Sequence, residues 1–202
     1  MAGLRERRHR ETRQALVEAA FELFANADFA DVTMEDIARA AGVSRSTAYR
    51  RFATKEEVVL EVPRRWLAAF DEALAALPEG TSLAEATRAT CLAVAAHIDR
   101  DHETVLAAYA VLQQAPSLQS SGLATRAWLE RLAEVLERFC PDPRADDAGH
   151  GDETGHAIGI VAGAYLGAID AMMQQWAADG GTGSVTEATE RLVDRLEPIL
   201  PT

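Results

Sequence analysis

The chain has 202 residues, and 48% of them are hydrophobic, so it is long enough to bury a core and too apolar to be disordered. Its formal net charge of −12 argues at first against a protein that binds nucleic acid. The charge is unevenly divided, however: residues 1–65 hold twelve basic and eleven acidic side chains, whereas residues 66–202 hold eight and twenty-one.

The chain begins with a basic segment that leads into the first predicted helix. The segment contains Arg5, Arg7, Arg8, Arg10 and Arg13, against only Glu6 and Glu11. Because no apolar stretch follows it, this start does not have the pattern of a signal peptide. Apolar residues recur at helical spacing from Leu16 to Phe24, which predicts a helix over residues 11–25.

Two short helices are predicted after the first. Thr33 can cap the first of them, and Gly42 ends it. Ser44 can cap the next helix, which ends near Phe52. The stretch 37–55 contains five basic residues and no acidic one. A basic surface of this kind on an otherwise acidic protein can bind phosphates.

The remaining chain is also predicted to be helical. Lys55 begins a fourth helix, and Pro63 should either kink or divide it. Further helices are expected over residues 82–100, 102–114, 118–139, 153–178 and 184–199. Loops rich in Gly, Pro and Asp separate some of them, and no segment has the pattern of a strand. The sequence therefore predicts an all-α protein.

The spacing of Ala38 and Gly42 is typical of a helix-turn-helix. A small residue at position 38 lets the second helix approach the third, and Gly42 tolerates a left-handed turn. The residues expected to point inward are Val17, Phe21, Phe24, Ile37, Ala41, Val43, Ala48 and Phe52. The outer face and the start of the third helix are then left to polar and basic side chains. Such a helix fits the major groove of DNA.

The segment from Thr12 to Val59 resembles the DNA-binding domain of the TetR family of repressors. The runs that carry the resemblance are Thr33–Ala38, Ala41–Phe52 and Lys55–Glu57. The resemblance implies a helix-turn-helix DNA-binding domain over residues 1–55 and a ligand-binding and dimerisation domain over residues 56–202. It also implies a cytoplasmic regulator, not an enzyme. Such a regulator binds a palindromic operator as a homodimer and is released by a small lipophilic effector.

The resemblance assigns contacts to positions around the third helix. Arg45 and Thr47 are expected to contact base edges or the groove, and Tyr49 a phosphate or a thymine methyl group. Lys55, at the start of the fourth helix, is expected to contact a phosphate. The full set of expected DNA contacts is Thr33, Ser44, Arg45, Ser46, Thr47, Tyr49, Arg50, Arg51 and Lys55. The sequence departs from the usual family pattern at Ser46, Ala48 and Arg51, so relatives do not predict its operator.

A stripe of small residues supports assembly into a dimer. Its members, which repeat every four residues, are Gly155, Gly159, Gly163, Gly167 and Ala171. Small residues let two helix backbones approach closely. The last helix has an apolar stripe of its own: Val185, Leu192, Leu196 and Ile199. We predict that the helices near 153–178 and 184–199 pair with their copies as a four-helix bundle. The alternative is that the glycines pack inside one subunit.

Bulky or polar residues on apolar helix faces are the candidates for an effector pocket. They are Trp66, Phe70, Cys91, His97, Tyr109, Trp128, Tyr165 and Met172. Aromatic walls with a few polar groups suit a lipophilic small molecule. The alternative for each residue is an ordinary place in the core.

Other kinds of site have weaker support. Cys91 and Cys140 are far apart and lack the spacing of a metal or redox motif, so both are expected to be reduced thiols. The clusters His97–His102 and His150–His156 do not match a known ligand spacing. The most apolar run, residues 157–169, is shorter than the ~20 residues that span a bilayer. We therefore expect no metal, no cofactor and no membrane partner.

Two other classes of protein remain as alternatives. The first is an enzyme with an accessory DNA-binding domain, but the sequence contains no set of nucleophile, base and acid and no phosphate-binding glycine loop. The second is a nucleoid or scaffold protein that binds DNA without sensing a ligand. Within the regulator class, activation remains an alternative to repression.

Overall fold

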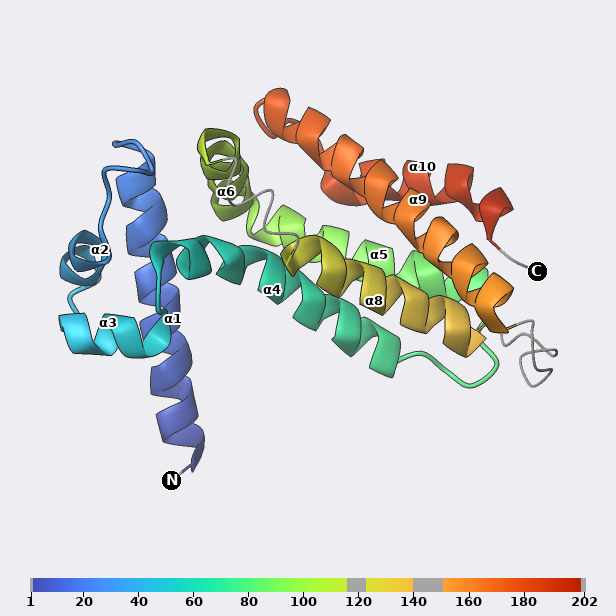
Figure 1. Ribbon diagram of the computed structural model, residues 1–202, viewed down its shortest axis with the longest axis horizontal. Coiled ribbons are helices and arrows are strands. Elements are labelled where there is room, and N and C mark those ends of the chain that lie inside the picture. The colour runs from blue at the N-terminus through green and yellow to red at the C-terminus, as the bar shows by residue number, and fades with distance from the viewer. Residues whose placement is uncertain (1, 116–122, 140–150, 201–202) are drawn as a thin grey trace. The chain divides into compact units, whose positions relative to one another are not determined.

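A computed structural model describes residues 2–115, 123–139 and 151–200 (Figure 1), and every regular element in this part of the chain is a helix. The helices are α1 (Ala2–Phe24), α2 (Met34–Ala40), α3 (Arg45–Arg51), α4 (Lys55–Ala75), α5 (Leu83–Arg100), α6 (His102–Gln114), α8 (Leu123–Phe139), α9 (Gly151–Ala178) and α10 (Val185–Leu196), followed by the 3-10 turn η1 (Glu197–Ile199). The predicted all-α class is confirmed. No helix among the described residues is long and apolar enough to cross a membrane.

The chain separates into two compact units. The first comprises Met1–Arg64 and Glu103–Ser121, and the second comprises Arg65–His102 and Gly122–Thr202. Helix α4 therefore contributes its first half to one unit and its second half to the other. The boundary expected between residues 55 and 56 falls at the start of this shared helix.

Helix α1 begins at Ala2, well before the start predicted at Glu11. The prediction rested on the apolar stripe, and a stripe marks where a helix packs, not where it begins. The first buried residue among the described side chains is indeed Leu16. The residues ahead of the stripe are rich in Arg, Ala, Leu and Glu, which favour helix without any packing.

Pro63 lies inside α4 and does not divide it, so of the two predicted outcomes, a kink or a division, the division is excluded. A proline in a helix removes one backbone hydrogen bond and disturbs the preceding turn. Here buried side chains anchor the helix on both sides of it: Val59 and Val62 before Pro63, and Phe70 and Leu74 after it. Packing therefore maintains the helix where its hydrogen bonding is interrupted.

The helices of the first unit pack around one apolar core. Of the residues predicted to point inward, the buried ones are Val17, Phe21, Phe24, Ile37, Ala48 and Phe52. Ala41 and Val43 are only half-buried, because they lie in the turn between α2 and α3. In that turn Gly42 has a φ of +66°, and the Val43 N–H donates to the Ala38 carbonyl oxygen at 3.0 Å. A residue with a side chain would be strained at this φ, so Gly42 fixes the angle between the two helices.

Asp99 joins the end of α5 to the start of α10 in the second unit. Its Oδ1 accepts a hydrogen bond from the Val185 N–H at 2.7 Å, and its Oδ2 accepts from the Thr186 N–H at 3.0 Å and from Ser184 Oγ at 2.8 Å. Burial alone would raise the pKa of Asp99, but these hydrogen bonds outweigh it and hold the pKa below 3.8. The carboxylate also lies at the positive end of the α10 dipole.

Three glycines of the predicted stripe lie on an exposed face of α9. Gly159, Gly163 and Gly167 are exposed, and a Cβ built on any of them would meet no atom within 4 Å. The alternative that these three glycines pack inside one subunit is therefore wrong. Ala171 is exposed as well, and Gly155 lies outside the side chains that the structure describes.

The apolar stripe predicted for the last helix is used mainly inside the subunit. Helix α10 packs on α5 and α9, with Val185 and Val193 buried. Leu196 packs against the core of the second unit, and Ile199 is 44% exposed. The outward face of α10 is instead charged, with Glu187, Glu190, Arg191, Asp194 and Arg195 exposed. Part of this stripe is therefore used within the subunit, and the pairing of α10 with its copy stays a prediction.

Candidate DNA-binding surface

Hydroxyl groups fix the start of α3. Ser44 is its N-cap: Ser44 Oγ accepts a hydrogen bond from the Thr47 N–H at 3.2 Å and donates to Thr47 Oγ1 at 2.9 Å. Ser46 Oγ lies 3.1 Å from Ser44 Oγ. The cap satisfies a backbone donor that the helix cannot pair itself. The hydroxyls of Ser44 and Thr47, two expected DNA contacts, are therefore already engaged within the protein.

The start of α2 is fixed in a similar way. Thr33 and Asp36 form a capping box, in which the backbone N–H of each residue donates to the side chain of the other at 3.2 Å. Hydrogen bonds from Thr33 and the nearby Arg39 guanidinium hold the pKa of Asp36 below 3.8. Thr33 is exposed, but its hydroxyl belongs to this cap.

The outward face of α3 carries basic and polar side chains. Its exposed members are Arg45, Ser46, Tyr49 and Arg50. The Arg45 side chain is 71% exposed, and Tyr49 is 40% exposed. On the opposite face, Ala48 and Phe52 are buried in the core. Arg51 is half-buried, and its Nε is shielded from solvent without a hydrogen-bond partner among the described residues. Four of the nine expected contacts therefore lie exposed on one surface.

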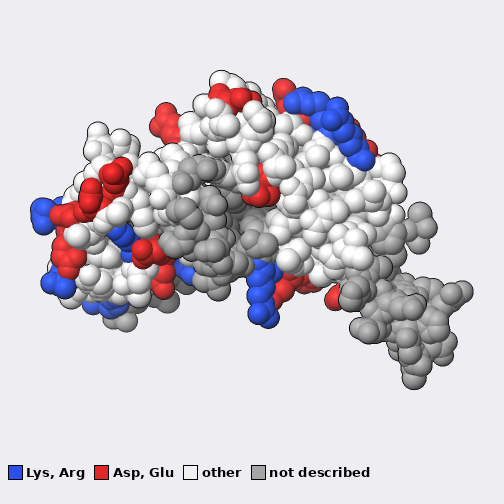
Figure 2. Space-filling model, turned by 45° about the horizontal axis from the view of Figure 1, so that its top comes forward, with Lys and Arg blue, Asp and Glu red and all other residues white. Residues whose placement is uncertain are grey.

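Glu35 of α2 contacts two of these outward side chains. Its Oε1 lies 2.8 Å from Arg45 Nη2, and the Tyr49 hydroxyl donates to the same oxygen at 3.3 Å. Arg45 Cζ lies 5.5 Å from the centroid of the Tyr49 ring. In Figure 2, red acidic and blue basic side chains lie next to one another at the left, over the first unit. An exposed ion pair is worth about 0–1 kcal/mol, so Arg45 can leave Glu35 for DNA at small cost.

Arg13 of α1 connects α3 to α4. Its Nη1 donates to the carbonyl oxygen of Arg51, the last residue of α3, at 2.9 Å. Its guanidinium also forms an ion pair with Glu61 of α4 and lies over the Phe52 ring, with Cζ 4.2 Å from the ring centroid. One side chain thus pairs a carbonyl at the end of α3 and holds that helix against two others. No local pattern in the sequence indicates this role or that of Glu35, because the partners lie far apart in the chain.

Lys55 is turned toward the protein, which corrects its predicted phosphate contact. Its Nζ donates to the carbonyl oxygens of Phe29, Ala30 and Val32 at 2.5, 3.1 and 2.8 Å. It also lies 4.5 Å from the centroid of the Phe29 ring. An ammonium group has three N–H donors, and all three are used here. Lys55 therefore holds the loop between α1 and α2 and has no donor left for DNA.

Comparisons with known proteins agree with this surface. Residues 16–62 match the family described as bacterial regulatory proteins, tetR family. The chain is also 30% identical over 183 residues to a Mycobacterium tuberculosis protein named as a mycofactocin biosynthesis transcriptional regulator, MftR. That match covers 90% of this chain and 87% of the other. This chain belongs to the TetR family of bacterial transcriptional regulators.

Solved structures share the fold over nearly the whole chain. The fatty acid degradation regulator FadR of Bacillus halodurans has a TM-score of 0.67 at 19% identity, over 92% of this chain and 94% of that one. Thermus thermophilus FadR in complex with lauroyl-CoA has a TM-score of 0.62 at 24% identity, over 94% and 95%. The predicted architecture of an N-terminal helix-turn-helix and a larger helical part is confirmed, and the chain is a regulator, not an enzyme.

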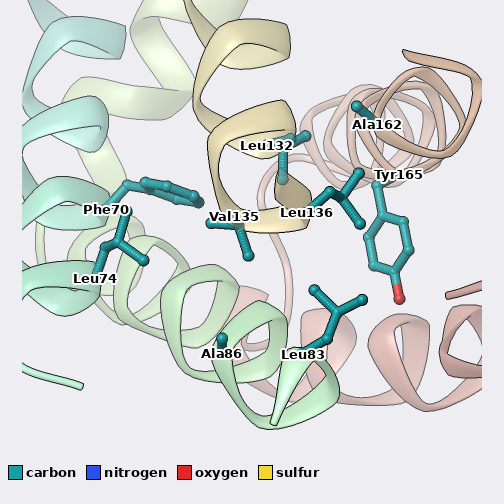
Figure 3. Packing of buried hydrophobic residues seen from close by; sticks show 9 residues of the cluster. All are labelled: Phe70, Leu74, Leu83, Ala86, Leu132, Val135, Leu136, Ala162 and Tyr165. Atoms are coloured by element: carbon teal, nitrogen blue, oxygen red, sulfur yellow. The ribbon is translucent and has the colours of Figure 1, made fainter. Parts of the chain in front are cut away.

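In this TetR-family regulator, some of the expected effector contacts meet in the core of the second unit. The core cluster comprises Phe70, Leu74, Leu83, Ala86, Leu132, Val135, Leu136, Ala162 and Tyr165 (Figure 3). Trp128 packs against it, with its ring centroid 5.7 Å from that of Phe70 in an edge-on contact. Cys91 is buried and close enough to Tyr165 to affect its ionisation.

The other effector candidates are more dispersed. Trp66, His97 and Met172 are half-buried, and Met173, not Met172, is the buried methionine of α9. Tyr109 is half-buried and belongs to the first compact unit. Phe70, Cys91, Trp128 and Tyr165 therefore lie in the second unit, and Tyr109 belongs to the other unit.

The interior of the second unit contains polar atoms without partners. Tyr165 Oη, Thr87 Oγ1 and His97 Nε2 are buried and have no hydrogen bond to any described residue. Burial raises the pKa of Tyr165 well above 10.0 and that of Cys91 to about 12, and burial lowers the pKa of His97. These groups are therefore neutral at pH 7. Tyr165 and Thr87 are each at most 3% exposed, so their unpaired atoms call for a partner.

The cluster His97–His102 does not converge on one point. Asp99 caps α10, and the His102 ring packs edge-on against Trp176 at 5.0 Å between centroids. Among the described residues, no three His, Cys, Asp or Glu side chains are placed to hold a metal ion. The His150–His156 cluster lies outside the described side chains.

Replacing Lys55 by Met is expected to lower the stability of the first unit by about 1–3 kcal/mol, because three carbonyl oxygens lose their donor. The measurement is the Tm of the protein without DNA. The dependence of duplex affinity on salt should stay as in the wild type, because no phosphate contact is removed. An unchanged Tm with a salt slope reduced by about 0.9 or more would show that Lys55 binds phosphate after all.

Proposed function

We propose that this regulator binds a palindromic operator as a homodimer, with α3 of each subunit in the major groove, and leaves the DNA when an uncharged lipophilic effector binds. The observation that carries the proposal is the outward face of α3, whose inner face is buried through Ala48 and Phe52. The exposed side chains on the outward face are Arg45, Ser46, Tyr49 and Arg50. A two-fold dimer would place the two helices in successive major grooves, about 34–36 Å apart.

The exposed side chains of α3 divide between reading bases and binding phosphates. Arg45 is the first residue of α3, and early residues of a recognition helix reach base edges. A guanidinium can donate two hydrogen bonds to guanine, which favours Arg45 as the base-reading residue. Tyr49 and Arg50 lie further along the helix and suit contacts to the backbone or to a thymine methyl group.

Arg45→Ala is expected to weaken binding to an operator selected from random duplexes by about 30-fold or more, because one good base contact is worth about 1–3 kcal/mol and the dimer presents two. Binding to unrelated duplexes should fall much less. Glu35→Gln should strengthen binding to all duplexes, because a negative charge beside the phosphates is removed. The measurement is equilibrium titration of both duplexes.

Arg195→Ala, on the exposed face of α10, serves as a control with the same loss of charge. An Arg45→Ala variant that loses the same factor on operator and unrelated DNA would contradict base reading by this residue.

The exposed glycine stripe of α9 supports the dimer. Its three described glycines meet nothing within their own subunit, although they lie on a helix whose other face is buried through Ala162, Tyr165 and Met173. The neighbouring Ile160 is 67% exposed, which is unusual for a large apolar side chain on a regular helix. A second copy of α9 packed against this stripe would cover both. The charged outward face of α10 suits the rim of such an interface rather than its centre.

Gly163→Leu is expected to weaken the dimer by at least tenfold and to leave the subunit folded. Gly163 is exposed, a Cβ built on it meets no atom within 4 Å, and leucine favours helix more than glycine does by about 0.5–1 kcal/mol. The measurement is analytical ultracentrifugation over a range of concentrations, with circular dichroism to verify folding.

Ala68→Leu, which enlarges an exposed residue of α4, serves as the matched control. A Gly163→Leu variant that dimerises like the wild type would exclude this face of α9 from the interface.

The proposed effector class follows from the interior of the second unit. The core cluster is apolar, and the fully buried polar side chains among the described residues are all threonines. Lauroyl-CoA, which Thermus thermophilus FadR binds, combines an acyl chain with phosphates. Residues 66–202 of this chain hold only eight basic side chains against twenty-one acidic ones, which disfavours an anion. An uncharged, largely apolar molecule with an oxygen that accepts a hydrogen bond from Tyr165 fits better.

Release from DNA would then follow from linkage. The dimer would have two arrangements, one with the α3 helices spaced for the operator and one with them spaced differently. An effector that prefers the second arrangement lowers operator affinity by the ratio of the effector's affinities for the two arrangements. A regulator of this kind acts where the chromosome is, in the bacterial cytoplasm. A DNA-binding scaffold without an effector differs from this proposal in one respect, because no small molecule would alter its affinity for DNA.

1-Decanol is the probe for this site, with lauroyl-CoA as the anionic comparison. Decanol is expected to raise the Tm and to weaken operator binding, whereas lauroyl-CoA should do neither. Tyr165→Phe should weaken decanol binding by about 3- to 10-fold, because one hydrogen bond is worth about 0.5–1.5 kcal/mol. The Tm of the variant without ligand should not fall, because the hydroxyl has no partner among the described residues.

Two results would contradict the effector proposal. A lower Tm of unliganded Tyr165→Phe would give the hydroxyl a structural role. An operator affinity that neither compound alters would favour the scaffold.

A further inference from the structure

The first turns of α1 extend beyond the packed core of the first unit. Helix α1 begins at Ala2, whereas its first buried described residue is Leu16. The described side chains from Arg7 to Glu11 are all exposed. At about 1.5 Å per residue, the segment from Ala2 to Thr12 is about 16 Å long. Apolar packing is what usually stabilises a helix in a protein, and the exposed side chains from Arg7 to Glu11 contribute none.

The segment is basic, and three of its arginines have no partner among the side chains that the structure describes. Arg7, Arg8 and Arg10 form no ion pair or side-chain hydrogen bond with any residue that the structure describes. Other arginines of the first unit are paired: Arg13 with Glu61, Arg39 with Asp36, and Arg45 with Glu35. Free arginines on an exposed helix are available to a phosphate.

Arg13 places this segment beside α3. Its hydrogen bond to the Arg51 carbonyl oxygen puts the corresponding turn of α1 at the C-terminal end of α3. Arg10 precedes Arg13 by three residues and therefore lies near the same face of α1, one turn further out. Arg8 lies on the other side of the helix, about 160° around the axis from Arg10, since each residue turns the helix by about 100°. Figure 1 shows α1 continuing past α3 toward the N-terminus.

We propose that the first turns of α1 form a second DNA-contacting element, in which Arg10 binds a backbone phosphate beside the groove that α3 enters. This inference rests on the proposed function. The contact adds affinity for any duplex without reading sequence, and it is therefore separate from the role of Arg45. The ion pair of Arg13 with Glu61 and its hydrogen bond to α3 keep the element in register with the recognition helix.

The test is a titration of the full-length dimer with a random-sequence duplex at several salt concentrations. Arg10→Ala is expected to reduce the slope of log affinity against log salt by about 1.8, since each lost phosphate contact changes it by about 0.9 and the dimer presents two. The loss should be the same on a selected operator. The Tm should not change, because Arg10 is exposed and pairs with no described side chain.

Arg8→Ala is the matched control on the opposite side of the same turn, and Arg195→Ala is the control in the second unit. Both should keep the wild-type slope. Equal slopes for Arg10→Ala and Arg8→Ala, whether both reduced or both unchanged, would overturn the assignment. Wild-type protein that binds no duplex would defeat the proposed function itself. Normal binding with a specific defect only in Arg45→Ala would defeat this inference alone.

Discussion

The DNA-binding surface depends on the burial of Ala48 and Phe52 behind α3. A helix of seven residues is too short to be stable in water without packing, so its orientation is decided by what its inner face contacts. Phe52 is 1% exposed and Ala48 is fully buried. The packing of these two side chains in the core fixes the orientation of the helix. The N-cap at Ser44 and the Arg13 hydrogen bond to the last carbonyl then close its two ends. The outer face is consequently free to vary without loss of the fold.

Positive charge near this helix serves two different purposes, and burial separates them. Arg13 and Lys55 are half-buried and donate their hydrogen bonds within the protein. Arg13 contacts a carbonyl oxygen and Glu61, and Lys55 contacts carbonyl oxygens, so both residues stabilise the first unit. Arg45 and Arg50 are exposed and keep donors for a ligand. Glu35 forms an ion pair with Arg45 and so holds this exposed side chain in a defined place. Because the pair is largely exposed, breaking it costs little free energy. A count of basic residues could not have made this distinction.

Local features of the sequence predicted local structure well. The caps at Thr33 and Ser44 and the turn at Gly42 depend on residues within a few positions of one another, and all three are present. The role of Lys55 was wrong because its three acceptors lie in a loop 23 to 26 residues earlier. The same reason hid Glu35 and Arg13. Periodicity shows that one face of α10 is apolar, but it does not show whether α5, α9 or a second subunit covers each member of that face.

Helix α4 gives the two units a shared mechanical element. It begins beside the DNA-binding helices and ends with Phe70 and Leu74 in the core of the second unit. A change in the packing of that core therefore acts on the same helix whose first turns are buried through Val58, Val59 and Val62 in the first unit. Pro63 removes one backbone hydrogen bond immediately before the second unit begins, so α4 bends there at lower cost than elsewhere along its length. Under the proposed release by an effector, a small difference in effector affinity between two arrangements of this helix would be enough, because about 1.4 kcal/mol of differential binding changes operator affinity tenfold.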